Sequence, residues 1–149
     1  VQKRLQSVCE KRKIAFQVTG TPCIVQGVRQ VLDEMVYNIS ENAIKYNREA
    51  GSITVTTGYK EQHPFIRVTD TGIGIPKAEQ ERVFERFYRV DKSHSKAVGG
   101  TGLGLSIVKH GAILHHATIH LDSTEQVGTT IEILFTEDTE QEEQSEKNV

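Results

Sequence analysis

Three polar residues on one predicted helix have side chains suited to a metal ion and a phosphate. Asn38, Asn42 and Lys45 stand at positions i, i+4 and i+7, a spacing that places them on one helix face. Amides cannot act as bases at neutral pH, but their oxygens can hold a hydrated Mg²⁺, and an amine can contact phosphate. The same spacing also fits an ordinary solvated polar face.

A single carboxylate, Asp70, stands at the end of a predicted strand, directly before "TGIGIP". A carboxylate there can accept a hydrogen bond from an exocyclic amino group such as that of adenine, and neighbouring glycines permit close approach. The alternative is an Asx turn, in which the side chain only bonds its own backbone.

A glycine-rich segment, "SKAVGGTGLGLSIVKH" at 95–110, has four glycines in six positions and runs into a predicted helix. Free N–H groups at a helix start, approached through glycines, suit a phosphate. Leu105 stands where a dinucleotide fingerprint needs glycine, and no Gly-Lys-Ser/Thr follows, so both common phosphate motifs are excluded. A flexible loop before an ordinary helix is the alternative.

Aromatic and basic residues alternate in the segment that precedes these glycines. Aromatic rings can cover a base and arginines can reach phosphates. A basic amphipathic helix that packs by its aromatic side chains is the alternative. The residues concerned are Phe84, Phe87, Tyr88, Arg82, Arg86, Arg89, Lys92 and Lys96.

The elements that must position these groups follow from hydrophobic periodicity. Helical spacing predicts helices at 1–12, 28–47, 76–87 and 102–114. Alternation predicts strands at 14–18, 23–25, 52–59, 65–70, 117–123 and 129–135, the last two forming a hairpin around 125–128. Helices and strands come in segregated runs. We therefore predict an α+β fold, a two-layer α/β sandwich whose mixed, mostly antiparallel sheet packs against helices.

Length and charge indicate one folded domain with an acidic end. The chain has 149 residues and a net charge of −2, but residues 136–149 carry −5, which leaves +3 on the remainder. We predict a domain at 1–135 and a disordered acidic tail at 136–149. Cys9 and Cys23 lack metal-binding spacing and are interpreted as reduced. No signal peptide and no apolar run of membrane-spanning length occurs, and the chain starts at Val1, as expected of a fragment.

Four segments in order resemble a known family. "NISENAIKY", "DTGIGI", "FERFYR" and "GGTGLGL" are similar to the N, G1, F and G2 boxes of the GHKL ATPases, specifically the catalytic and ATP-binding domain of sensor histidine kinases. The resemblance covers about residues 10–135. It implies the Bergerat fold, with ATP and Mg²⁺ held between the helix layer and a mobile ATP lid, expected at 90–99.

The resemblance also implies roles for individual residues. Asn42 looks like the Mg²⁺ ligand with Asn38 nearby, Lys45 like a phosphate contact, and Asp70 like the reader of the adenine amino group. Arg89 looks like a lid-edge residue near the γ-phosphate. The further residues expected to contact the nucleotide are Tyr46, Gly72, Gly74, Ile75, Tyr88, Gly100, Thr101, Gly102, Leu103, Gly104, Leu105 and Thr130.

The implied activity is transfer of the ATP γ-phosphate to a histidine on a separate dimerisation domain of the same kinase. None of the six histidines is followed by an acidic residue, so the acceptor is expected outside this chain. The implied partners are that dimerisation domain and a downstream response regulator, with no nucleic acid. We expect the isolated domain to be monomeric, the full-length kinase to be a homodimer, and this part to be cytoplasmic in a membrane-bound sensor.

Two rival classes share the nucleotide boxes. A self-standing serine kinase of the anti-sigma type should have Glu where Asn38 stands and should lack "FERFYR". A non-catalytic nucleotide-binding module should have lost Asn42, Asp70 or the glycines, all of which are present. One departure from the family is "HHA" at 115–117, where His-Gly-Gly is frequent. We interpret the histidines at 115, 116 and 120 as packed or solvated rather than metal ligands.

Overall fold

A five-stranded mixed sheet carries the fold in the computed structural model, which describes residues 1–89 and 103–136. The strand order is β1-β2-β3-β5-β4; β1 and β2 are parallel, and the other pairs are antiparallel. The predicted α+β class with a mixed, mostly antiparallel sheet is confirmed. The strands are β1 (Ala15–Gly20), β2 (Ser52–Lys60), β3 (His63–Asp70), β4 (Ala117–Thr124) and β5 (Gly128–Phe135).

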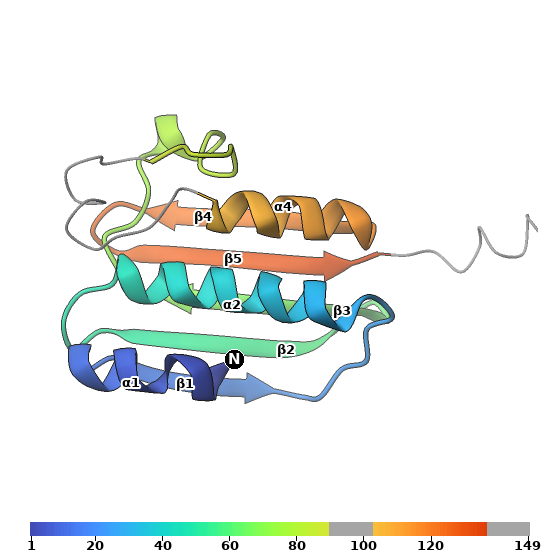
Figure 1. Ribbon diagram of the computed structural model, residues 1–149, viewed down its shortest axis with the longest axis horizontal. Helices are drawn as coiled ribbons and strands as arrows, with labels where there is room; N and C mark the ends of the chain where they lie inside the picture. Colours follow the sequence, from blue (N-terminus) through green and yellow to red (C-terminus); the bar gives the residue numbers. More distant parts are fainter. Residues whose placement is uncertain (90–102, 137–149) are drawn as a thin grey trace, which may run out of the picture.

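Three helices, α1 (Gln2–Arg12), α2 (Arg29–Lys45) and α4 (Gly104–Leu114), cover one face of this sheet (Figure 1). Every second residue of the central strands points toward them, because side chains alternate along a strand. Full burial of one such aliphatic side chain stabilises the fold by about 1.5–3 kcal/mol. The most deeply buried side chains of this core are Met35, Ile44, Ile53, Val108 and Ile133.

Close packing of α2 against α4 sets the geometry of the predicted site. The two helices run in opposite directions (Figure 1). A Cβ placed on Gly111 of α4 would lie 2.5 Å from Met35 Sδ of α2, so a larger residue there would require the Met35 side chain to shift. As a result the start of α4 lies beside the second half of α2. In the described ranges no helix is both long and apolar enough to cross a membrane.

Two predicted elements are wrong. The segment 23–25 is not a strand: Ile24 is exposed, and its N–H donates to Tyr59 Oη at 2.9 Å instead of joining the sheet. The predicted helix at 76–87 is a short 3₁₀ helix, η1 (Lys77–Glu79), followed by turns. Most backbone bonds there span three residues, and Phe87 adopts a left-handed φ of 63°, which ends any helix. The predicted lid at 90–99 and the tail from 137 onward lie outside the described residues.

The "HHA" segment forms the turn between α4 and β4. His116 has a φ of 51°, the left-handed conformation that favours glycine, so the chain keeps a glycine-like turn with a histidine. His115 is buried; its Nδ1 lies 2.8 Å from Gly111 O, and its Nε2 accepts the Val28 N–H at 3.0 Å. His116 and His120 are exposed. The interpretation of packed or solvated histidines agrees with this arrangement.

Candidate functional site

Asp70 ends β3, and the hydrogen bonds of its carboxylate fall on one oxygen. Oδ1 accepts the Gly72 N–H at 2.8 Å, which is the predicted Asx turn, and the Thr129 N–H at 3.3 Å. No residue within 1–89 or 103–136 donates to Oδ2. The Asx turn and the ligand-binding interpretation are therefore compatible, because the turn orients the carboxylate and leaves an acceptor.

Burial raises the pKa of Asp70 from its ordinary value of 3.8 to about 6, although the two backbone donors act in the opposite direction. The group is therefore mainly ionised at neutral pH and can accept a hydrogen bond from an amino group. A half-buried carboxylate with a raised pKa and an open oxygen is a candidate functional group.

The loop after Asp70 is held against the end of α2. The Ile73 N–H donates to Tyr46 O at 3.0 Å. A Cβ on Gly72 would lie 2.3 Å from the same oxygen, and Gly74 has a φ of 71°, so both positions require glycine. The loop that resembles the G1 box thus has its shape fixed by the helix that carries the N box.

The opposite side of this loop is held by the β4–β5 hairpin. Ser123 Oγ accepts the Ile75 N–H at 2.8 Å and lies 2.7 Å from Thr129 Oγ1. Gln80 Nε2 donates to Ile75 O at 3.0 Å and to Ser123 O at 3.1 Å. Ser123 and Thr129 therefore connect the loop to Asp70, a connection that the sequence analysis missed.

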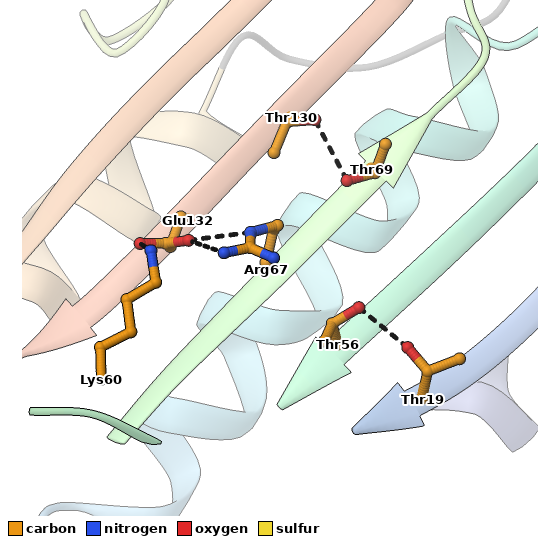
Figure 2. Close-up of polar contacts among 7 residues, drawn as sticks. All are labelled: Thr19, Thr56, Lys60, Arg67, Thr69, Thr130 and Glu132. Atoms are coloured by element: carbon orange, nitrogen blue, oxygen red, sulfur yellow. Dashed lines mark hydrogen bonds and ion pairs between the residues drawn. The ribbon is translucent and has the colours of Figure 1, made fainter. Parts of the chain in front are cut away.

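The sequence analysis expected Thr130 at the nucleotide, but the structure does not bring it together with the other candidates. Its Oγ1 lies 3.1 Å from Thr69 Oγ1 on the sheet face that carries no helix, as Figure 2 shows. Thr129, one residue earlier, is buried on the helix side with Ile131 and Ile133. Side chains alternate between the two sheet faces along "TTIEILF", so Thr129 shares the buried face of Ile131 and Ile133. This alternation is the sequence signal that favours Thr129 over Thr130.

Two amide side chains of α2 face the start of α4. Asn38 is only 8 % exposed, so it does not belong to a solvated helix face. Its Nδ2 donates to Glu34 O at 2.7 Å, which turns Oδ1 toward Gly104. A Cβ on Gly104 would lie 3.2 Å from Asn38 Oδ1 and 3.8 Å from Asn42 Oδ1. Two amide oxygens beside a helix N-terminus fit a Mg²⁺–phosphate group, since Mg²⁺ takes oxygen ligands and the helix start attracts anions.

The remaining candidate residues differ in their contacts and in how deeply they are buried. Lys45 Nζ lies 3.5 Å from a Glu41 carboxylate oxygen on the same helix. The guanidinium of Arg82 stacks over the Tyr88 ring at 4.3 Å. Leu105 is buried in the core rather than turned to a ligand. The other candidates, Tyr46, Ile75, Arg89 and Leu103, are partly buried, whereas Gly100, Thr101 and Gly102 lie outside the described residues.

A half-buried carboxylate acceptor, a glycine loop and paired amide oxygens beside a helix start are the features expected of a nucleotide-binding α+β sandwich. Residues 27–139 match the family model described as histidine kinase-, DNA gyrase B- and HSP90-like ATPase, and the chain belongs to this family. Within it, the chain is an ATP-binding catalytic domain of the sensor histidine kinase type.

Curated relatives support this placement. The chain is 46 % identical over 118 residues to the sensor histidine kinase WalK of Bacillus subtilis, covering 78 % of this chain and 19 % of WalK. It is 44 % identical over 113 residues to the sensor-like histidine kinase SenX3 of Mycolicibacterium smegmatis, covering 76 % of this chain and 29 % of SenX3. The chain therefore spans less than a third of the length of either relative.

Solved structures agree with the fold. The mycobacterial sensor histidine kinase MprB aligns with a TM-score of 0.76 and 33 % identity, over 90 % of this chain and 91 % of that one. The catalytic domain of the histidine kinase ThkA aligns with a TM-score of 0.76 over 90 % of this chain and 86 % of that one, but at 23 % identity it supports the fold alone.

Proposed function

We propose that this domain, holding ATP with Mg²⁺, transfers the γ-phosphoryl group to a histidine on a separate dimerisation domain of a longer kinase. The proposal rests on two groups that occur in the same domain. One is the open carboxylate oxygen of Asp70, and the other is the pair of amide oxygens of Asn38 and Asn42 beside Gly104. The first group suits adenine and the second suits a metal-bound phosphate. Relatives named as sensor histidine kinases support the same reaction.

Each residue has a defined task in this proposal. Asp70 Oδ2 accepts a hydrogen bond from the adenine amino group, and Asn42 Oδ1, with Asn38 beside it, supplies oxygen to Mg²⁺. Lys45 exchanges its ion pair with Glu41 for a phosphate oxygen. The bound Mg²⁺ neutralises phosphate charge. The remaining residues implied by the resemblance line the nucleotide, except that Thr129 takes the place of Thr130 and Leu105 belongs to the core.

Transfer of the phosphoryl group is favoured over hydrolysis of ATP because position 38 holds an asparagine and not a residue that can act as a base. Asn38 cannot take a proton from water at neutral pH, and a positioned base is worth about 10²–10⁴ in rate. An imidazole is itself a nucleophile at that pH. Its nitrogen forms a bond to the γ-phosphorus while the bond to the bridging oxygen breaks and ADP leaves. A response regulator then receives the phosphoryl group.

A labelling experiment tests this function. The chain is incubated with [γ-³²P]ATP and Mg²⁺, alone and with a separately expressed dimerisation domain of a relative such as WalK. We expect acid-labile label on the added domain and none on the chain itself. An Asp70→Asn variant should lower the labelling, while Asp122→Asn, which alters an exposed β4 carboxylate, should not. Stable label on the chain alone would contradict the proposal.

A further inference from the structure

The last turn of α2 is held by a residue from another helix. The final carbonyls of a helix have no partner within it. Arg12, the last residue of α1, donates through its guanidinium to Ile44 O, to Lys45 O at 3.1 Å and to Asn47 O at 2.5 Å. The carbonyl between them, Tyr46 O, accepts the Ile73 N–H at 3.0 Å. Four successive carbonyls are thus shared between Arg12 and the glycine loop.

Backbone bonds fix the position of Arg12 itself. The Ala50 N–H donates to Arg12 O at 3.2 Å, and the Ala15 N–H donates to Gly51 O at 3.0 Å. These bonds join the α1–β1 connection to the loop between α2 and β2. A guanidinium suits this place, because its planar set of donors can serve several carbonyls at once and its charge complements the negative end of the helix dipole.

The turn that Arg12 holds is the turn that carries the candidate site. Lys45 and Tyr46 belong to it, and the Tyr46 carbonyl holds the loop that begins two residues after Asp70. If the carbonyls of this turn lost their donor, the helix end would fray toward water. Lys45 on the phosphate side and the loop beside Asp70 on the adenine side would then move together.

We propose that Arg12 is a positioning residue for the nucleotide site, through which α1 sets the geometry of the end of α2. The inference rests on the proposed nucleotide-binding function. Arg12 lies outside residues 27–139, the region that matches the family model. By linkage, binding of nucleotide and the seating of α1 stabilise each other.

The chain offers a matched control on the same helix. Arg4 also contacts α2, with its guanidinium 3.9 Å from the Tyr37 ring centroid and 3.6 Å from a Glu34 carboxylate oxygen. Its contacts lie two or more turns before the end of α2. Arg4→Gln therefore removes a charged contact between the same two helices without touching the last turn.

The test is calorimetric titration with Mg·ADP and Mg·IDP, which differ in the exocyclic group of the base. It compares the wild type, R12Q, R12K and R4Q at a temperature where each is fully folded by circular dichroism. We expect R12Q to bind ADP about tenfold more weakly, at the lower end of the cost of losing charge-assisted hydrogen bonds. We expect R12K to lie between R12Q and the wild type, and the preference for ADP over IDP to fall in R12Q. R4Q should bind like the wild type.

The outcomes separate the two proposals. If the wild type binds ADP and R12Q binds it with the same affinity and selectivity, the role of Arg12 is overturned and the function stands. If R12Q and R4Q weaken ADP binding equally, Arg12 serves only general stability and the inference is wrong. If R12Q does not fold, R12K decides: wild-type affinity and selectivity in R12K overturn the inference. A wild type that does not bind ADP overturns the proposed function, and this inference with it.

Discussion

The backbone N–H of Thr129 on β5 donates to Oδ1 of Asp70 on β3 at 3.3 Å, and the Gly72 N–H donates to the same oxygen at 2.8 Å. The two donors hold Oδ1 in place. Within the described ranges they leave Oδ2 as an acceptor without a donor. Burial of this group costs stability, as its raised pKa indicates, so the fold retains a charge that packing alone does not favour.

Asp70→Asn should weaken ADP binding by about tenfold or more, because its single amide oxygen stays with the Gly72 and Thr129 N–H donors and an NH2 donor then replaces the acceptor Oδ2. The amide oxygen can still accept from the backbone donors, so the fold should be retained. Calorimetric titration with Mg·ADP measures the change, and Asp122→Asn on the exposed part of β4 is the control. Unchanged affinity in Asp70→Asn would show that Asp70 serves only its turn.

Folding stability should depend on pH through Asp70. Its pKa is about 6 in the folded chain, above the ordinary 3.8, so the folded state binds the proton more tightly. The carboxyl group therefore stabilises the fold least when ionised, and its contribution falls as pH rises from about 4 to about 6. Urea unfolding should find Asp70→Asn more stable than the wild type at pH 7.5, by on the order of 1–2 kcal/mol. A difference that is the same at pH 4 and pH 7.5 would contradict this account.

Nucleotide affinity should also depend on the protonation of Asp70, but it should fall as pH falls, whereas the contribution of Asp70 to folding stability falls as pH rises. Below pH 6 the protonated carboxyl group of Asp70 is no longer a charged acceptor for an amino group. We expect ADP binding by the wild type to weaken as pH falls from 7 to 5, and the profile of Asp70→Asn to be flatter. Titrations across this range, corrected for protonation of the ADP phosphates, provide the measurement. Parallel profiles for the two proteins would argue against Asp70 as the titrating group.

Adjacent threonines on β5 should differ in function. Thr129→Val removes the hydroxyl that lies 2.7 Å from Ser123 Oγ, and so loosens the connection to Ile75. Thr130→Val removes only a contact with Thr69 on the open sheet face. Valine keeps the shape of threonine in both. ADP affinity should fall several-fold in Thr129→Val and stay unchanged in Thr130→Val; the reverse result would restore the original expectation for Thr130.

A charge cluster on the open sheet face should contribute to stability (Figure 2). Glu132 accepts hydrogen bonds from Lys60 at 2.7 Å and from Arg67 Nε at 2.8 Å. Burial acts to raise the pKa of Glu132, but these hydrogen bonds and charges outweigh it and lower the pKa. Its contribution is therefore present at neutral pH and is lost as pH falls through the lowered pKa. Glu132→Gln should cost about 1 kcal/mol at pH 7. The loss should be smaller at pH 3, and a loss independent of pH would contradict the electrostatic origin.

His116→Gly should stabilise the protein. His116 holds a φ of 51°, which costs a residue with a side chain about 1–2 kcal/mol, while glycine adopts it freely. After the greater entropy loss of glycine on folding, we expect a net gain of about 0.5–1 kcal/mol in the free energy of unfolding. Ala117→Gly, in the neighbouring strand position, should instead destabilise it. Urea denaturation of both variants measures the two signs, and a loss of stability in His116→Gly would show that its side chain has a packing role.

The sequence by itself determined the elements whose periodicity is long and regular. The apolar spacing of α2 and the alternation in β2, β4 and β5 predict these elements because each buries one face against one core. The order of the four nucleotide-binding motifs predicted the GHKL family, and the match of residues 27–139 to the family model confirms it. Asp70 and the two amides of α2 were selected as candidate site residues from residue type and position, since strand ends and helix faces follow from local geometry.

Only the tertiary structure decided which side chains meet from elements far apart in the chain. Arg12 and the end of α2 are more than 30 residues apart, and Asp70 and Thr129 are 59 apart. No local pattern encodes such pairs, because they depend on how helices and strands pack. The helix predicted at 76–87 failed for the same reason: Gln80 binds Ile75 O and Ser123 O, contacts that draw this segment onto the β4–β5 hairpin in place of regular helical structure. Local periodicity sets the elements, and packing between distant segments sets the site.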